Sequence, residues 1–144
     1  NKEKESEKAL KGGWMHTGDA GRMDEEGFVF IQDRIKDMIV SGGENIYSTE
    51  VEAALFAHPD VVDAAVIGVP DEKYGEVVKA CIVKKEGSNV TEDDLISFCK
   101  DKIASYKKPQ SVDFIDEVPR NASGKVLKKV LREPYWRDQE RQVS

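Results

Sequence analysis

Lys125 follows a Ser-Gly pair within the segment 119–129, PRNASGKVLKK, and precedes an apolar-periodic stretch that predicts a helix. A lysine at a helix start is disfavoured because the helix dipole attracts anions there. The position becomes favourable if the ammonium group and the helix N-terminus bind an anion together. The segment is not a phosphate-binding P-loop, because Pro119 stands where the motif needs glycine and Val126 where it needs Ser or Thr. The spacing leaves two interpretations open, a solvated lysine and an anion-binding lysine.

Two more polar residues, Asp19 and Arg34, could contact a nucleotide. Asp19 ends the segment HTGD, where a carboxylate after glycine could accept hydrogen bonds from a ribose diol, although aspartate after glycine is usually a turn residue. Arg34 could contact the nucleotide or form an ion pair with Asp33 or Asp37. From spacing alone we favour the ion pair.

The pair Gly42-Gly43 also has two interpretations. Without a Cβ atom, these residues allow a ligand to approach the main chain closely. The alternative, which the local sequence favours, is a turn that joins a strand to a helix.

The elements that must position these residues alternate along the chain. The expected order is a helix near residues 1–11, a hairpin of two strands over 14–34, a strand over 36–43, a helix within 47–56, strands over 61–69 and 77–85, a helix within 89–103, a strand over 111–119 and a last helix from 124 that Pro134 interrupts. Helices interleaved with strands predict a small α+β fold with helices packed on a central sheet.

Two helix starts carry capping signals. Thr91 with Asp94 three residues later resembles a capping box. Ser48 or Thr49 is expected to be the N-cap of the helix within 47–56.

Composition excludes several classes of protein. Among 144 residues, 22 Lys and Arg against 28 Asp and Glu give a net charge of −6, which argues against general binding to nucleic acid or an anionic membrane. No run approaches the roughly 18 apolar residues of a membrane-spanning helix. Cys81 and Cys99 lie in apolar patterns without metal-ligand spacing, so we expect no metal site and reduced core thiols in a cytoplasmic protein.

Several motifs in a set order resemble one enzyme family. The segments WMHTGDAGRMDEEGFVFIQDRIKDMIVSGGENIYSTEVE, HPDVVDAAVIGVPDEKYGE and SYKKPQSVDFIDEVPRNASGK are similar to the C-terminal part of the adenylate-forming acyl-CoA synthetases. The similarity runs from about Gly13 to about Arg132. It departs from the common pattern at Ser48, where many members have proline, and in RNASGK, which replaces a more usual Arg/Lys-Thr run.

The resemblance implies a reaction in two steps and roles for three residues. A carboxylic acid and ATP with Mg²⁺ give an acyl-adenylate, and CoA then displaces AMP to form a thioester. The resemblance implies that Lys125 contacts the acyl carboxylate and α-phosphate during adenylation. It likewise implies that Asp19 binds the ribose hydroxyls of ATP or AMP and that Arg34 supports the same ribose.

The resemblance also implies a division into two domains. Residues 1–35 would be the end of a large N-terminal domain, and residues 36–144 a mobile lid domain with its hinge at Lys36. Gly42 and Gly43 would line the tunnel that admits the pantetheine arm of CoA.

The family's phosphate loop and acyl pocket precede the part that this sequence resembles, so the chain is expected to be a fragment, inactive alone. Its partners would be the carboxylic acid, ATP, CoA and the N-terminal domain, which would also bind most of the Mg²⁺. Two alternatives remain: the C-terminal part of a peptide-synthetase-type adenylation domain that loads a carrier protein, and a non-catalytic nucleotide- or CoA-binding module.

Overall fold

The computed structural model describes residues 2–137. Within this range the elements are, in order, α1 (Glu3–Ala9), η1 (Lys11–Gly13), β1 (Asp19–Met23), β2 (Val29–Arg34), η2 (Ile35–Asp37), β3 (Ile39–Ser41), β4 (Glu44–Ile46), α2 (Ser48–Phe56), β5 (Val61–Asp71), β6 (Gly75–Lys84), α3 (Glu92–Lys100), η3 (Ser105–Lys107), β7 (Ser111–Phe114) and α4 (Lys128–Trp136). The predicted alternation is confirmed, except that the strand expected over 36–43 is the first arm of a short hairpin, β3–β4.

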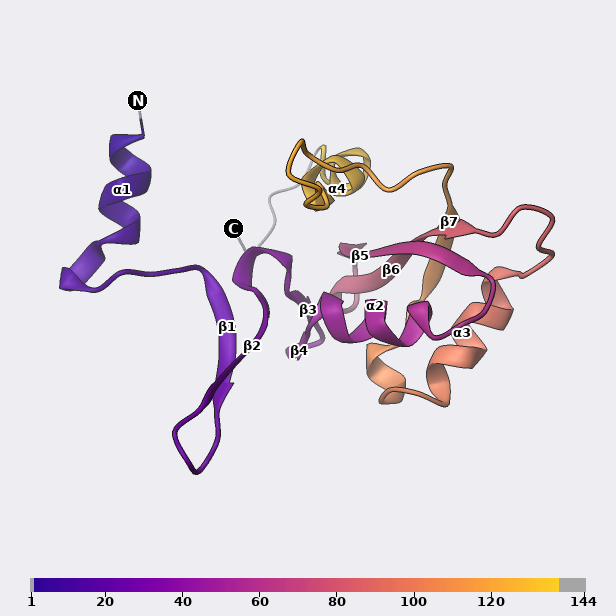
Figure 1. Ribbon diagram of the computed structural model, residues 1–144, viewed down its shortest axis with the longest axis horizontal. Helices are drawn as coiled ribbons and strands as arrows, with labels where there is room; N and C mark the ends of the chain where they lie inside the picture. Colours follow the sequence, from indigo (N-terminus) through magenta and orange to yellow (C-terminus); the bar gives the residue numbers. More distant parts are fainter. Residues whose placement is uncertain (1, 138–144) are drawn as a thin grey trace.

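The hairpin β1–β2 and helix α1 extend away from the rest of the molecule (Figure 1). At the bend, the Asp24 carboxylate accepts hydrogen bonds from the N–H groups of Glu26 and Phe28, at 3.0 and 2.9 Å. The two strands were predicted correctly. Their large apolar side chains are exposed, including those of Val29 and Ile31. The hairpin therefore lacks a core of its own.

The main sheet is built on two long antiparallel strands, β5 and β6, which pair from Val61↔Lys84 to Asp71↔Gly75. The strand order is β4-β3-β6-β5, and β7 pairs with β6 in parallel. β3 and β7 thus share one edge of β6, and the ladder between β3 and β6 consists of the pair Ser41↔Gly75. The predicted α+β fold is confirmed.

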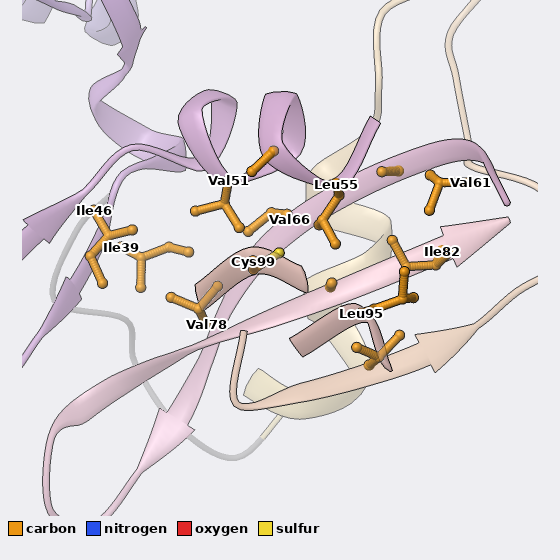
Figure 2. Packing of buried hydrophobic residues seen from close by; sticks show 14 of the residues in the cluster. Ile39, Ile46, Val51, Leu55, Val61, Val66, Val78, Ile82, Leu95 and Cys99 are labelled. Atoms are coloured by element: carbon orange, nitrogen blue, oxygen red, sulfur yellow. The ribbon is translucent and has the colours of Figure 1, made fainter. Parts of the chain in front are cut away.

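Both faces of this sheet are covered. On one face, α2 and α3 pack over a cluster that includes Val66, Val78 and Leu95 (Figures 1 and 2). On the other face, α4 packs over a smaller cluster that includes Ile67 and Cys81. Successive side chains of a strand alternate between faces, so a strand covered on both sides is apolar at nearly every position. This explains the continuous apolar runs of β5 and β6.

The capping box of α3 is confirmed, whereas the predicted cap of α2 is wrong. The Thr91 hydroxyl accepts from the Asp94 N–H, and the Asp94 carboxylate accepts from the Thr91 N–H. At α2 the N-cap is Tyr47, without a side-chain capping bond. Ser48 and Thr49 bind residues of β2 instead, because the end of that strand lies beside the start of the helix.

Pro134 does not interrupt the last helix, contrary to the prediction. α4 continues through Pro134 to Trp136. Leu131 and Tyr135 pack on the sheet, and Trp136 Nε1 donates to the Gly68 carbonyl at 3.0 Å. These contacts on both sides of the proline hold the helix where local propensity would end it. None of the helices within residues 2–137 combines the length and apolar content that a membrane crossing requires.

Candidate functional site

The hairpin brings Asp19 and Arg34 together. They are cross-strand partners in the β1–β2 register, and Arg34 Nε lies 2.9 Å from Asp19 Oδ1. The expected pairing of Arg34 with Asp33 or Asp37 is therefore wrong. Adjacent side chains of a strand point to opposite faces, so Asp33 is directed away from the guanidinium, whereas Asp19 lies across from it. Together, a carboxylate oxygen and a partly exposed cation could contact a polar ligand.

A cavity of about 520 Å³ lies beside this pair, lined by residues of α1 and η1, by 16–18 and by 34–36. Its walls are mostly apolar, and Lys8, Lys11, Arg34 and Lys36 contribute cationic side chains. This combination suits a ligand with an apolar ring and an anionic group.

The segment that contains Lys36 is held by the last helix. Arg132 Nη1 of α4 donates to the Lys36 carbonyl and to Asp37 Oδ1, both at 3.1 Å. The side chains of Arg132 and Asp37 are mostly buried. Lys36 itself lies in the short 3₁₀ helix η2. The predicted hinge position therefore contacts the folded domain through its main chain.

Gly42 and Gly43 form the two-residue turn of the β3–β4 hairpin, rather than a turn from strand to helix. Both have positive φ, +59° and +87°, as this type of hairpin turn requires. The Gly42 N–H donates to the Tyr74 carbonyl at 2.8 Å. A Cβ atom on Gly42 would lie 3.2 Å from Tyr74 Cδ1, whereas one on Gly43 would have no neighbour within 4 Å among residues 2–137. The Gly43 side of the turn is open to an approaching ligand.

Lys125 does not lie at a helix N-terminus, so that prediction is wrong. α4 begins at Lys128 with Leu127 as its N-cap. Residues 119–127, called the lysine loop below, fold back on themselves instead, so the helix begins only after them. Lys125 is exposed, and among residues 2–137 its ammonium group has no hydrogen bond or ion pair. The helix dipole therefore does not account for this lysine, which presents an uncompensated positive charge.

A buried polar network, which the sequence did not predict, connects β2, α2 and α4. The fully buried Ser48 Oγ donates to Asp33 Oδ2 at 2.6 Å and accepts from Lys128 Nζ at 2.5 Å. Lys128 Nζ also lies 2.7 Å from Glu52 Oε1. Thr49 adds a hydrogen bond from its hydroxyl to the Gln32 carbonyl at 2.6 Å. The one sequence signal was the serine at position 48, where many members of the resembled family have proline.

Burial changes the acidity of several groups. Burial raises the pKa of Glu52, and the nearby Lys128 ammonium lowers it in part. Burial also raises the pKa of the Cys81 and Cys99 thiols to about 11. Both thiols are free and buried, as predicted, and remain protonated at neutral pH, which makes them poor nucleophiles.

Comparison with known proteins identifies the family. The sequence profile of the AMP-binding enzyme C-terminal domain matches residues 50–125, more than half of the chain. The chain belongs to this family. The resemblance inferred from the motifs is therefore confirmed.

Its relatives are acid ligases. The chain is 55% identical over 121 residues to a methyl-dioxo-octahydroindenyl-propanoyl:CoA ligase of Rhodococcus jostii, covering 84% of this chain and 24% of that protein. It is 50% identical over 135 residues to the fatty acid–acyl-carrier-protein ligase ScoC of Streptomyces coeruleorubidus, covering 94% and 26%. The crystal structure of ATP-bound MatB from Rhodopseudomonas palustris superposes with a TM-score of 0.82 at 41% identity, covering 92% and 26%. The chain spans about a quarter of the length of these proteins.

Proposed function

We propose that this chain is the C-terminal part of an ATP-dependent acid–CoA ligase. In the first step an oxygen of the carboxylic acid attacks the α-phosphorus of ATP, and the bond to pyrophosphate breaks. In the second step the CoA thiolate attacks the acyl carbon, and AMP leaves. The observation that carries the proposal is the exposed Lys125 ammonium group, unpaired within the described range 2–137, in a member of this family.

Lys125 is the proposed catalytic residue of the adenylation step. Negative charge gathers around the carboxylate and the α-phosphate as the new P–O bond forms. An ammonium group that no acidic side chain of residues 2–137 neutralises can stabilise that charge once the site closes and excludes water.

Asp19 and Arg34 are the proposed contacts to the ribose of the nucleotide. Arg34 Nε contacts Oδ1 of Asp19, so Oδ2 can accept a hydrogen bond from a ribose hydroxyl. Their neighbouring cavity has room for part of the nucleotide. No three His, Cys, Asp or Glu side chains within residues 2–137 are grouped to hold a metal ion. We therefore assign the Mg²⁺ that accompanies ATP to the rest of the enzyme.

We propose a division at Lys36, with residues 1–35 belonging to the large domain and residues 36–144 forming the mobile domain. All residues of both core clusters follow Lys36, whereas the hairpin exposes its apolar side chains. A large domain would cover that surface. Residues 138–144 of the proposed mobile domain lie outside the described residues.

Gly42 and Gly43 are the proposed contacts to the pantetheine arm of CoA. The β3–β4 turn is exposed, and no described residue lies within 4 Å of where a Cβ atom on Gly43 would be, so the described part of the chain leaves this side open to the arm. A side chain at Gly43 would both narrow that space and require a strained positive φ.

A carrier-protein acceptor is the second candidate function. A relative of the chain at 50% identity is an acyl-carrier-protein ligase. The first step is the same for both candidates, and only the thiol that accepts the acyl group differs. Supplying the full-length enzyme with free CoA or with a phosphopantetheinylated carrier protein distinguishes them: faster thioester formation on the carrier would replace the CoA assignment.

The test of the proposal separates the two steps in the full-length enzyme. Lys125→Ala should lower acid-dependent ATP–pyrophosphate exchange by about a hundredfold or more, as loss of a preorganised electrostatic contact does. Thioester formation from supplied acyl-adenylate should change little. The 144-residue chain alone is the negative control, because we expect it to form no acyl-adenylate. Unchanged exchange in Lys125→Ala would overturn the proposed role.

A further inference from the structure

The lysine loop is closed by its own main chain. Arg120 and Val126 form an isolated antiparallel bridge. The Leu127 N–H donates to the Pro119 carbonyl at 2.8 Å. These bonds join the two ends of the loop, so its tip moves with the domain and not as a free segment.

Inside the loop, the side chain of Asn121 is the centre of the hydrogen bonding. Its Oδ1 accepts from the Lys125 N–H at 2.9 Å, from the Ser123 N–H at 3.1 Å and from the Ser123 hydroxyl at 2.8 Å. The main chain of Asn121 also donates to the Lys125 carbonyl and accepts from the Gly124 N–H, both at 2.9 Å. Lys125 is therefore held at both its N–H and its carbonyl, while its ammonium group has no partner among residues 2–137.

The neighbouring Arg120 connects the loop to the sheet. Its Nη2 donates to both carboxylate oxygens of Asp63 in β5, at 2.9 and 2.8 Å. Its Nη1 donates to the Gly124 carbonyl at 3.1 Å. A partly exposed ion pair contributes little stability, but a planar guanidinium bound on two sides sets a direction. The residue before Lys125 is thereby placed relative to β5.

We propose that Asn121, assisted by Arg120, is a positioning residue for Lys125. This inference rests on the proposed function, because it gives the loop the task of presenting the Lys125 ammonium group to the reacting carboxylate and phosphate. With the main chain of Lys125 held, only its side-chain rotamers must be ordered when the site closes. Preorganisation of this kind lowers the entropic part of the activation barrier.

Asn121 permits a sharp test, because the side-chain hydrogen bonds described above all end on its Oδ1, which accepts them. Asn121→Asp keeps that acceptor, whereas Asn121→Leu has a similar size and no acceptor. In the full-length enzyme we expect Asn121→Leu to lower ATP–pyrophosphate exchange by about 10- to 100-fold, the range typical of a misplaced catalytic group. Asn121→Asp should keep most of the activity.

The second half-reaction controls for folding. Thioester formation from supplied acyl-adenylate does not require Lys125 in the proposed mechanism, so it should be nearly the same in all Asn121 variants. Equal loss of both half-reactions in Asn121→Leu would indicate a general structural defect and would overturn the positioning role. If Asn121→Asp were as impaired as Asn121→Leu, the acceptor role would be wrong.

Lys125→Ala measured in parallel separates this inference from the proposed function. If Lys125→Ala loses exchange while Asn121→Leu retains it, the catalytic role stands and the positioning role fails. If Lys125→Ala itself retains exchange, the proposed function of Lys125 is wrong, and the positioning role that rests on it is wrong as well.

Discussion

Lys125 and Lys128 are the same residue type three positions apart, in opposite environments. Lys125 is exposed in the lysine loop, and its ammonium group is unpaired within residues 2–137. Lys128 begins α4, is 9% exposed and binds both Ser48 and Glu52. One charge is neutralised within the fold, and the other is available to a ligand.

The comparison shows that the environment decides what a lysine can do. A buried ammonium group is stable only when its charge and its donors have partners, so Lys128 is expected to contribute to stability. An exposed, unpaired one contributes little to stability. Measured stability should therefore separate the two lysines sharply, in denaturant unfolding of the 144-residue chain.

The largest expected effect is that of Lys128→Met, which leaves the Glu52 carboxylate buried without its partner. Removing one member of a buried ion pair typically costs about 3–5 kcal/mol of unfolding free energy. The double variant Lys128→Met/Glu52→Gln should recover much of this loss, because it removes the uncompensated charge. A loss below about 1 kcal/mol in the single variant would contradict the contrast between the lysines.

The cost of Lys128→Met should also depend on pH. Burial already raises the pKa of Glu52 from 4.5, and loss of Lys128 would raise it further. A carboxyl group with a raised pKa in the folded state stabilises that state below its unfolded pKa and loses this contribution as the pH rises. The gap between wild type and variant should therefore narrow below about pH 4.5 and widen toward pH 7.

A smaller effect is expected for Ser48→Ala, which removes the hydroxyl between Asp33 and Lys128. Hydrogen bonds to charged groups contribute about 1.5–3 kcal/mol, and we expect a loss in that range. Ser97→Ala, at an exposed position of α3, is the matched control and should change stability by no more than about 0.5 kcal/mol. If Ser48→Ala and Ser97→Ala lowered the unfolding free energy equally, the hydrogen bonds of Ser48 would contribute no stability of their own.

The smallest effect is expected for Lys125→Met, the counterpart of Lys128→Met. Because the side chain has no partner within residues 2–137, unfolding free energy should stay within about 0.5 kcal/mol of wild type. A loss above about 1 kcal/mol would show that the Lys125 side chain stabilises the fold.

Some interactions between near neighbours in the sequence could be predicted. The capping box joins Thr91 and Asp94, so a single segment contains both partners. The hairpin β1–β2 and the apolar strands β5 and β6 could also be predicted, because each strand has its pattern within one short segment. The order of the motifs along the chain in addition predicted the family.

Interactions between distant segments could not be predicted. The partner of Arg34 depends on strand register, which placed Asp19 opposite it. Ser48 binds a residue of β2 and one of α4, and no local signal favours that over a helix cap. The start of α4 moved past Lys125 because the loop closes through the Arg120–Val126 bridge, which competes with helix formation.

The docking of Asp33 onto Ser48 has a consequence for movement. Asp33 precedes the proposed hinge at Lys36 and Ser48 follows it, so a rotation there would separate them. A contact made of polar groups can be exchanged for water at a limited net cost, about 1.5–3 kcal/mol for a hydrogen bond to a charged group, whereas an apolar face of several side chains would lose more. The contact would thus favour one orientation of the two proposed domains. It would still be weak enough to break each time the domains rotate about the proposed hinge.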